Sequence, residues 1–399
     1  MDAYALEWLN LLVRWLHLIT GIAWIGASFY FVWLDNHLEV PTREADIKRD
    51  VSGELWAVHG GGFYHAEKFR ARPPSMPANL HWFKWEAYWT WLSGFALLVI
   101  VYYAGADLYL IDRSVAQLSH AGAVAIGLGV IAGGWIVYDV LCKSSLARND
   151  RALSGVLFVL ICLAAWGLTQ VFGGRGAYMH FGAMLGTIMV ANVAMIIIPA
   201  HKEMVRAAGE GRDPDPRFGI AGKQRSVHNT YFTLPVLFVM MSSHYAFTYG
   251  HHYNWALLIL MTVAGALIRV WFVDRHKGKQ SPLTLVAAGA LLALVAWAGM
   301  PAKQSATADA ASDFARVRGV VSLRCAGCHA AQPTQPGVAV APKGILFDSD
   351  AQIRSQAALI VQQSVTTKVM PPGNLTQMTD DERALVARWA ASAAPRITP

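Results

Sequence analysis

The chain has 399 residues, of which 55% are hydrophobic and 15% charged, and its formal net charge is +7 at pH 7. A soluble domain has about 25% charged residues, so this composition indicates that most of the chain lies in a lipid bilayer. The basic residues are spread over many loops, which argues against a nucleic-acid-binding protein. The N-terminal MDAYALEWLN has no basic n-region, so we expect the first apolar segment to be a retained helix, not a cleaved signal peptide.

Eight apolar stretches are long enough for a helix to cross the hydrocarbon core, which needs about 20 residues. They lie at roughly 9–33, 86–105, 119–141, 152–172, 178–199, 230–249, 254–273 and 282–300. The segments between spans 1–2, 3–4, 5–6 and 7–8 hold 19 Lys and Arg in total, whereas those between spans 2–3, 4–5 and 6–7 hold 2. The positive-inside rule therefore places the first set in the cytoplasm and both termini outside.

This pattern predicts an all-α, eight-span transmembrane bundle over residues 1–300. The small, polar stretch that follows, at 301–312, is typical of a linker between domains.

The stretch RCAGCH at residues 324–329 has the C-x-x-C-H spacing that attaches haem covalently. Cys325 and Cys328 would form the thioethers of haem c, and His329 would bind its iron. A zinc site is the alternative, but it needs a second pair of ligands, and no Cys or His follows His329. We expect a class I-like cytochrome c domain at 313–399. Such a domain matures outside the cytoplasm, in agreement with the loop charges.

A c-type haem used for electron transfer commonly has a methionine as its sixth ligand, which raises its potential. Met370 is the expected ligand, because the two prolines after it keep its segment extended. Met378 is the rival, and it lies in the polar run before the last predicted helix. Thr379 and Glu382 have the spacing of a capping box at the start of that helix.

Ionisable residues inside a bilayer are rare and often functional. In the first span, Asn10, Arg14, His17 and Gly21 fall on one stripe that should face the bundle. His244 lies near the outer end of the sixth span. Two further histidines lie near outer ends of spans: His120 and His180. Histidines at similar depth could hold a non-covalent haem b, bind substrate, or simply bond neighbouring helices, and the sequence leaves these alternatives open.

The predicted inner side carries a second group of candidates, in the long loop 34–85 and at the inner ends of the fifth and sixth spans. His59 and His65 are the main ones. The other polar residues of this group are Glu67, Lys68, His81, Lys84, Glu86, His201, His228 and Asn229. Loops held by a rigid bundle often carry binding residues, although aromatic-rich edges such as these also act as interfacial anchors.

Three stretches, joined to the C-x-x-C-H motif, resemble the membrane-bound, cytochrome-c-linked urate oxidases of bacterial purine degradation. They are WLHLITGIAWIGASFYFVWLDNHL, GGGFYHAEKF and HNTYFTLPVLFVMMSSHY. The resemblance implies oxidation of urate to 5-hydroxyisourate with oxygen from water and without hydrogen peroxide. Electrons would pass to the fused haem c and on to a respiratory acceptor, such as a soluble cytochrome c or a terminal oxidase. The resemblance assigns the haem-binding roles of the family to Cys325, Cys328, His329 and Met370. It assigns no catalytic residue in the membrane part.

Urate is a planar monoanion, so its pocket should offer an aromatic face, a cation and a proton acceptor. Arg14 with His17 would supply the last two on the outer side. His59 and His65, with Lys68 or Lys84, would supply them on the inner side. The sequence does not decide between the two sides.

Two other functions compete with this one. The first is a quinol-oxidising electron-transfer subunit with b haems in the bundle and haem c as the exit. The second is a transporter with a redox-sensing cytochrome, which would show internal repeats, and none is evident. Haem c accepts one electron at a time whereas most organic substrates give two, so a second redox centre or a radical stage is also needed.

Overall fold

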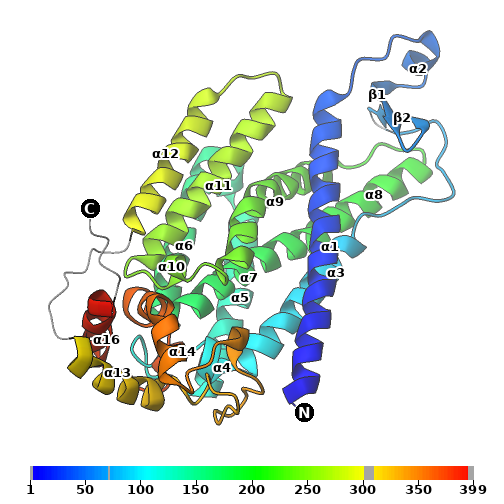
Figure 1. Cartoon of the computed structure of the whole chain (residues 1–399). Helices are drawn as coiled ribbons and strands as arrows, with labels where there is room; N and C mark the ends of the chain where they lie inside the picture. Colours follow the sequence, from blue (N-terminus) through cyan, green and yellow to red (C-terminus); the bar gives the residue numbers. More distant parts are fainter. Residues whose placement is uncertain (1–2, 71, 301–309, 394–399) are drawn as a thin grey trace.

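The computed structural model describes residues 3–70, 72–300 and 310–393 (Figure 1). It is 71% helix and 5% strand, so the chain is mostly helical, as predicted. The helices of the first 300 residues are α1 (Ala3–His37), α2 (Glu44–Lys48), α3 (Trp85–Leu97) with the π-helix η1 (Leu98–Tyr103), α4 (Ala106–Tyr109), α5 (His120–Lys143), the 3₁₀ turn η2 (Ser145–Arg148), α6 (Asp150–Val171), α7 (Gly174–Asn192) with η3 (Val193–Ile197) and α8 (Ile198–Gly209), α9 (Pro216–Ser242), α10 (Ala246–Tyr249), α11 (Asn254–His276) and α12 (Pro282–Ala298).

Five helical segments of the described residues are long and apolar enough to cross a membrane. They are Tyr4–His37, His120–Lys143, Asp150–Val171, Gly174–Gly209 and Asn254–His276. The apolar helix α12 is shorter, at 17 residues. Helical structure also covers the other two predicted spans, but α3 passes into a π-helix and α9 begins with several polar turns. The count of eight spans therefore stays a prediction.

Helix α7 is the most enclosed of these segments. In the continuous helical segment Gly174–Gly209, which α7 begins, 61% of the most apolar stretch is buried. None of the corresponding stretch of α1 is buried. Glycines let the neighbouring helices approach it closely. A Cβ at Gly127 of α5 would lie 2.5 Å from the His180 ring, and one at Gly182 would lie 2.6 Å from Val239 of α9. Small residues at such crossings allow the dense packing that holds membrane helices together.

The all-α prediction is wrong for part of the long loop, which forms a β-hairpin. Strands β1 (Val51–His59) and β2 (Gly62–Phe69) pair antiparallel, with Trp56 opposite His65. The strands are rich in aromatic and β-branched residues, which favour extended structure. Gly60 and Gly61, with φ of 57° and 80°, provide the left-handed turn between them.

The sixth predicted span also differs from the structure. Helix α9 ends at Ser242, and His244 lies in a turn before α10 instead of inside a continuous helix. The backbone N–H groups of His244 and Tyr245 donate to Met241 and Ser242, closing that turn. His244 is consequently exposed rather than embedded in a helix face.

The residues from 310 onward have a hydrophobic core of their own. Their helices are α13 (Ala310–Arg324), η4 (Pro342–Gly344), α14 (Asp350–Ser355), α15 (Ala357–Ile360) with η5 (Val361–Thr366), η6 (Pro372–Asn374) and α16 (Asp380–Ala393). Phe314 of α13 packs on Trp389 of α16, with ring centroids 5.6 Å apart. The expected linker at 301–312 lies mostly outside the described residues, and the division into domains stays a prediction.

These C-terminal helices lie at the same end of the bundle as the start of α1, and the hairpin lies at the opposite end (Figure 1). Two glycines permit close contact between the two parts. A Cβ at Gly250 would lie 2.4 Å from the Thr367 carbonyl oxygen, and one at Gly373 would lie 2.2 Å from that of Ile111. Segments far apart in sequence are thus held together at this end.

Candidate functional site

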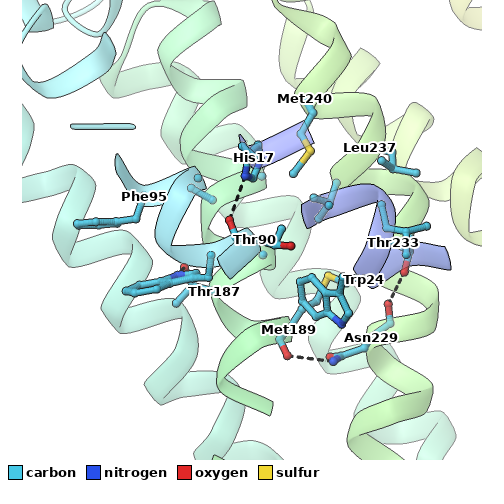
Figure 2. A pocket seen from close by; sticks show the side chains of 18 of the residues that line it. His17, Trp24, Thr90, Phe95, Thr187, Met189, Asn229, Thr233, Leu237 and Met240 are labelled. Carbon is cyan, nitrogen blue, oxygen red and sulfur yellow. Dashed lines mark hydrogen bonds between the residues drawn. The ribbon is translucent and has the colours of Figure 1, made fainter. Parts of the chain in front are cut away.

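A cavity of about 970 Å³ lies among α1, α3, α7 and α9. We call it the bundle cavity. Its lining is mostly apolar and includes the aromatic ring of Trp91. The rings of Trp24 and Phe95 also line it (Figure 2). The size is typical of a pocket for a small organic molecule, and flat rings offer stacking surfaces for a planar one.

His17 contributes a polar edge to this cavity. Its Nδ1 lies 3.0 Å from the Thr90 carbonyl oxygen (Figure 2). The same nitrogen lies 3.1 Å from Ser93 Oγ. A carbonyl oxygen only accepts, so Nδ1 is the donor and the neutral ring keeps Nε2 as an acceptor. A Cβ at Gly94 would lie 2.8 Å from the His17 ring, so glycine there makes room for the imidazole.

Three residues of the predicted α1 stripe, Arg14, His17 and Gly21, line the bundle cavity. Asn10, His17 and Gly21 are partly covered, whereas Arg14 is exposed and donates to Asn10 Oδ1 at 3.1 Å. Arg14 still contributes to the cavity lining, as does His244 from the turn after α9. The structure thus brings Arg14, His17 and His244 to one cavity.

The other two outer histidines lie apart from this cavity. Buried His180 donates from Nδ1 to the Gly176 carbonyl oxygen at 2.9 Å, and its Nε2 lies 3.3 Å from the Tyr103 hydroxyl. His120 is exposed and lies 3.1 Å from Asp107. Both nitrogens of His180 are engaged within the protein, so of this group His17 and His244 are the better candidates for a ligand.

At the other end of the bundle cavity, a buried network joins α5, α7 and α9. Asn229 donates to the Met189 carbonyl oxygen at 2.9 Å, as Figure 2 shows. Asn192 donates to Asn229 Oδ1 at 2.9 Å and to the Tyr138 hydroxyl at 3.0 Å. Tyr138 in turn lies 2.8 Å from His228 Nδ1. His228 is therefore tied into helix packing, while Asn229 reaches the cavity.

The hairpin histidines are not among the residues that line either cavity described here. His65 Nε2 lies 2.6 Å from Glu54 Oε2, and its ring stacks on Trp56. Arg43 pairs with the same carboxylate at 3.1 Å. His59 is exposed at the end of β1. The inner-side site stays a prediction that the cavities do not favour.

The other inner-side candidates differ in whether they line the bundle cavity. His81 and His201 line the bundle cavity. Lys68 forms an ion pair with Asp35, and the Lys84 ammonium lies 5.4 Å from an indole centroid. The two lysines are thus paired elsewhere, so neither reaches the cavity in this structure.

A second cavity, of about 1150 Å³, lies where the C-terminal helices meet the bundle. We call it the junction cavity. Cys325, Cys328, His329 and Met370 all line it. The two thiols are free, not joined as a disulfide, and burial raises the pKa of the Cys325 thiol to about 12.

The donor set of the junction cavity fits a covalently attached haem. His329 donates from Nδ1 to the Ile345 carbonyl oxygen at 3.0 Å, which leaves Nε2 as the nitrogen available to iron. Met370 is partly exposed in the cavity, whereas Met378, although it also borders the cavity, is only 3% exposed and packs in the C-terminal core. This contrast favours Met370 over Met378 as the ligand.

The two cavities share three lining residues, Arg175, Ser243 and His244. Arg175 did not stand out in the sequence as a site residue. Two features of the sequence could have drawn attention to it. Arg175 is one of 2 basic residues in the predicted outer segments between spans, and it lies between two glycines. Because Arg175 lines both cavities, its positive charge would attract a negatively charged ligand in either of them.

The fold and these cavities describe a mostly helical protein with membrane-length helices and a histidine-containing, aromatic pocket. The family model described as urate oxidase N-terminal matches residues 3–300. The chain belongs to this urate oxidase family, which indicates a urate-related oxidative role. No curated protein and no solved structure matches the chain.

Proposed function

We propose that the protein is a membrane-bound urate:cytochrome c oxidoreductase. Urate and water yield 5-hydroxyisourate, two electrons and two protons, so the added oxygen comes from water and no hydrogen peroxide forms. The family match over residues 3–300, with a C-x-x-C-H motif in the same chain, is the observation that carries this proposal.

The bundle cavity is the proposed place of urate oxidation. Its aromatic rings would stack on the planar purine, and Arg14 would contribute positive charge. His17 Nε2 would accept a proton, since its Nδ1 is committed to the Thr90 carbonyl oxygen. These roles follow from the positions of the groups and from the chemistry of a monoanionic substrate.

In the junction cavity, Cys325 and Cys328 would hold haem c, and His329 and Met370 would bind its iron. When bound, haem c supplies one-electron transfer to a respiratory acceptor, such as a soluble cytochrome c or a terminal oxidase. Because the two cavities share lining residues, electrons would have a short distance to travel between them.

The proposed location is a bacterial inner membrane. Eight spans over residues 1–300, a linker at 301–312 and a periplasmic cytochrome c domain at 313–399 would place both termini outside. The charge difference between the two sets of loops supports this orientation. The start of α1 and the C-terminal helices lie at the same end of the bundle, which supports placing both termini on one side (Figure 1).

Anaerobic mixing tests the proposal. Full-length protein in detergent, fully oxidised, is mixed with urate while the absorption spectrum of haem c is recorded. Prompt reduction by urate is the expected result. Reduction by a quinol alone would instead favour the quinol-oxidising alternative, and reduction by neither would leave the transporter hypothesis. Material that emerges without covalent haem, from cells able to mature cytochromes, would refute the proposal outright.

A further inference from the structure

Arg175 is held at the start of α7 by an unusually tight backbone. Its neighbours are both glycines, and neither position has space for a side chain. A Cβ at Gly174 would lie 1.9 Å from the Tyr249 carbonyl oxygen, and one at Gly176 would lie 2.9 Å from Leu110. This packing fixes the place from which the Arg175 side chain extends.

The guanidinium of Arg175 is half-buried and held by tyrosines. Its Nε donates to the Tyr102 hydroxyl at 3.2 Å, and its Cζ lies 4.7 Å from the centroid of the Tyr109 ring. Over the described ranges, no Asp or Glu forms an ion pair with it. A partly desolvated cation without a carboxylate partner is favourably placed to bind an anion.

The lining of the bundle cavity adds a second argument. Its described residues include two arginines, Arg14 and Arg175, and no Asp or Glu. The junction cavity differs, because two carboxylates, Asp112 and Asp380, line it. Several basic residues besides Arg175 also line it. The bundle cavity is thus the more suitable of the two for a small, negatively charged ligand, and Arg175 is the less exposed of its two arginines.

We infer that Arg175 makes the direct contact with the negative charge of the substrate, while the exposed Arg14 adds positive charge to the cavity. It would hold the monoanionic purine at the end of the bundle cavity that adjoins the junction cavity, beside His244. The inference rests on the proposed function, and it makes Arg175 a binding residue instead of part of the haem site. Substrate would thereby be bound next to the cavity that holds the C-x-x-C-H motif.

Equilibrium binding tests this role apart from turnover. Full-length protein is reduced with dithionite, so that urate is not oxidised, and the Kd of radiolabelled urate is measured by equilibrium dialysis. Arg175→Gln is expected to weaken urate binding by about 10- to 100-fold, since a hydrogen bond to a charged group contributes about 1.5–3 kcal/mol. Hypoxanthine, a neutral planar purine, should displace urate from the variant and the wild type with Ki values that agree within about twofold.

Arg113→Gln is the matched control, because Arg113 is the other basic residue of the predicted outer segments and lines neither cavity. Arg175→Lys, which keeps the charge, should lose less affinity than Arg175→Gln and covers the case in which the glutamine variant does not fold. An unchanged urate Kd in both variants would overturn the inference, and a shifted haem potential with that unchanged Kd would assign Arg175 to the haem. Failure of urate to bind or reduce the wild type would instead refute the proposed function.

Discussion

His17 Nδ1 and the Thr90 carbonyl oxygen, 3.0 Å apart, tie α1 to α3 at the edge of the bundle cavity. The bond assigns the two ring nitrogens different tasks, because one is used in helix packing and the other is left for a ligand. It also separates the structural contribution of His17 from its proposed chemical one.

His17→Asn should preserve the fold and impair turnover. An asparagine amide N–H can replace Nδ1 as the donor to Thr90, whereas nothing replaces Nε2. We expect kcat for urate-driven reduction to fall by about 100-fold, within the range for loss of a general base. Stopped-flow absorbance under anaerobic conditions measures it.

His37→Asn is the matched control on the same helix, since His37 Nδ1 also bonds a backbone carbonyl oxygen, that of Trp33 at 2.8 Å. It does not line the cavity, so its turnover should match the wild type. Full activity in His17→Asn would remove His17 from the mechanism. Loss of acid-extractable haem in that variant would show that His17 serves a haem b instead.

Met370→Ala should lower the reduction potential of haem c and slow urate-driven turnover, because a thioether ligand raises the potential. A redox titration followed by absorbance measures the change. Met378→Leu is the comparison, since Met378 packs in the C-terminal core and a leucine of similar volume should cost less than about 1.5 kcal/mol. A potential that moves in Met378→Leu and not in Met370→Ala would reverse the ligand assignment.

Glu382 should make the C-terminal helices sensitive to acid. Burial acts to raise the pKa of Glu382, but the backbone N–H of Thr379 and the Arg324 guanidinium outweigh it and hold this pKa below its ordinary value of 4.5. Arg324 Nη2 and Glu382 Oε1 are 3.0 Å apart, with both side chains 20% exposed. A lowered folded-state pKa means that the stabilisation is present above pH 4.5 and is lost as the pH falls through the folded pKa.

Glu382→Gln is therefore expected to cost about 1–2 kcal/mol at neutral pH, between the values for exposed and buried pairs. Thermal unfolding of the full chain, followed by circular dichroism, measures the difference. The variant and the wild type should converge in acid. Asp381→Asn changes the exposed neighbouring carboxylate and serves as the control. An equal difference at neutral and acidic pH would contradict this account.

Breaking the buried pair between Asp139 and Arg225 should destabilise the bundle. Arg225 Nη2 lies 2.8 Å from Asp139 Oδ1, and its side chain is 3% exposed. Asp139→Ala leaves a buried cation without its partner, which costs about 3–5 kcal/mol. Lys143 pairs with the same carboxylate from the solvent side, so Lys143→Ala should cost less than about 1 kcal/mol. Thermal denaturation in detergent measures the stability of the two variants. An equal loss of stability in Asp139→Ala and Lys143→Ala would contradict the conclusion that the buried pair with Arg225 is the important one.

Much of the helical architecture could be predicted from the sequence, because long apolar runs have few alternatives to a helix in lipid. The five segments long enough to cross a membrane all fall on predicted spans. The capping box at Thr379 and Glu382 is also confirmed, with reciprocal bonds of 3.2 and 2.8 Å. The β1–β2 hairpin differs from the predicted loop, because the aromatic residues that favour strands are equally typical of interfacial loops.

Local sequence determined the helices, the cap and the C-x-x-C-H motif, since each depends on residues only a few positions apart. The tertiary structure alone decided which polar residues share a cavity. His17, Arg175 and His244 come from three distant segments, and their meeting depends on helix crossings set by glycines such as Gly94 and Gly176. The same packing engages both ring nitrogens of His180 within the protein. The sequence alone could not distinguish His180 from His17 in this respect.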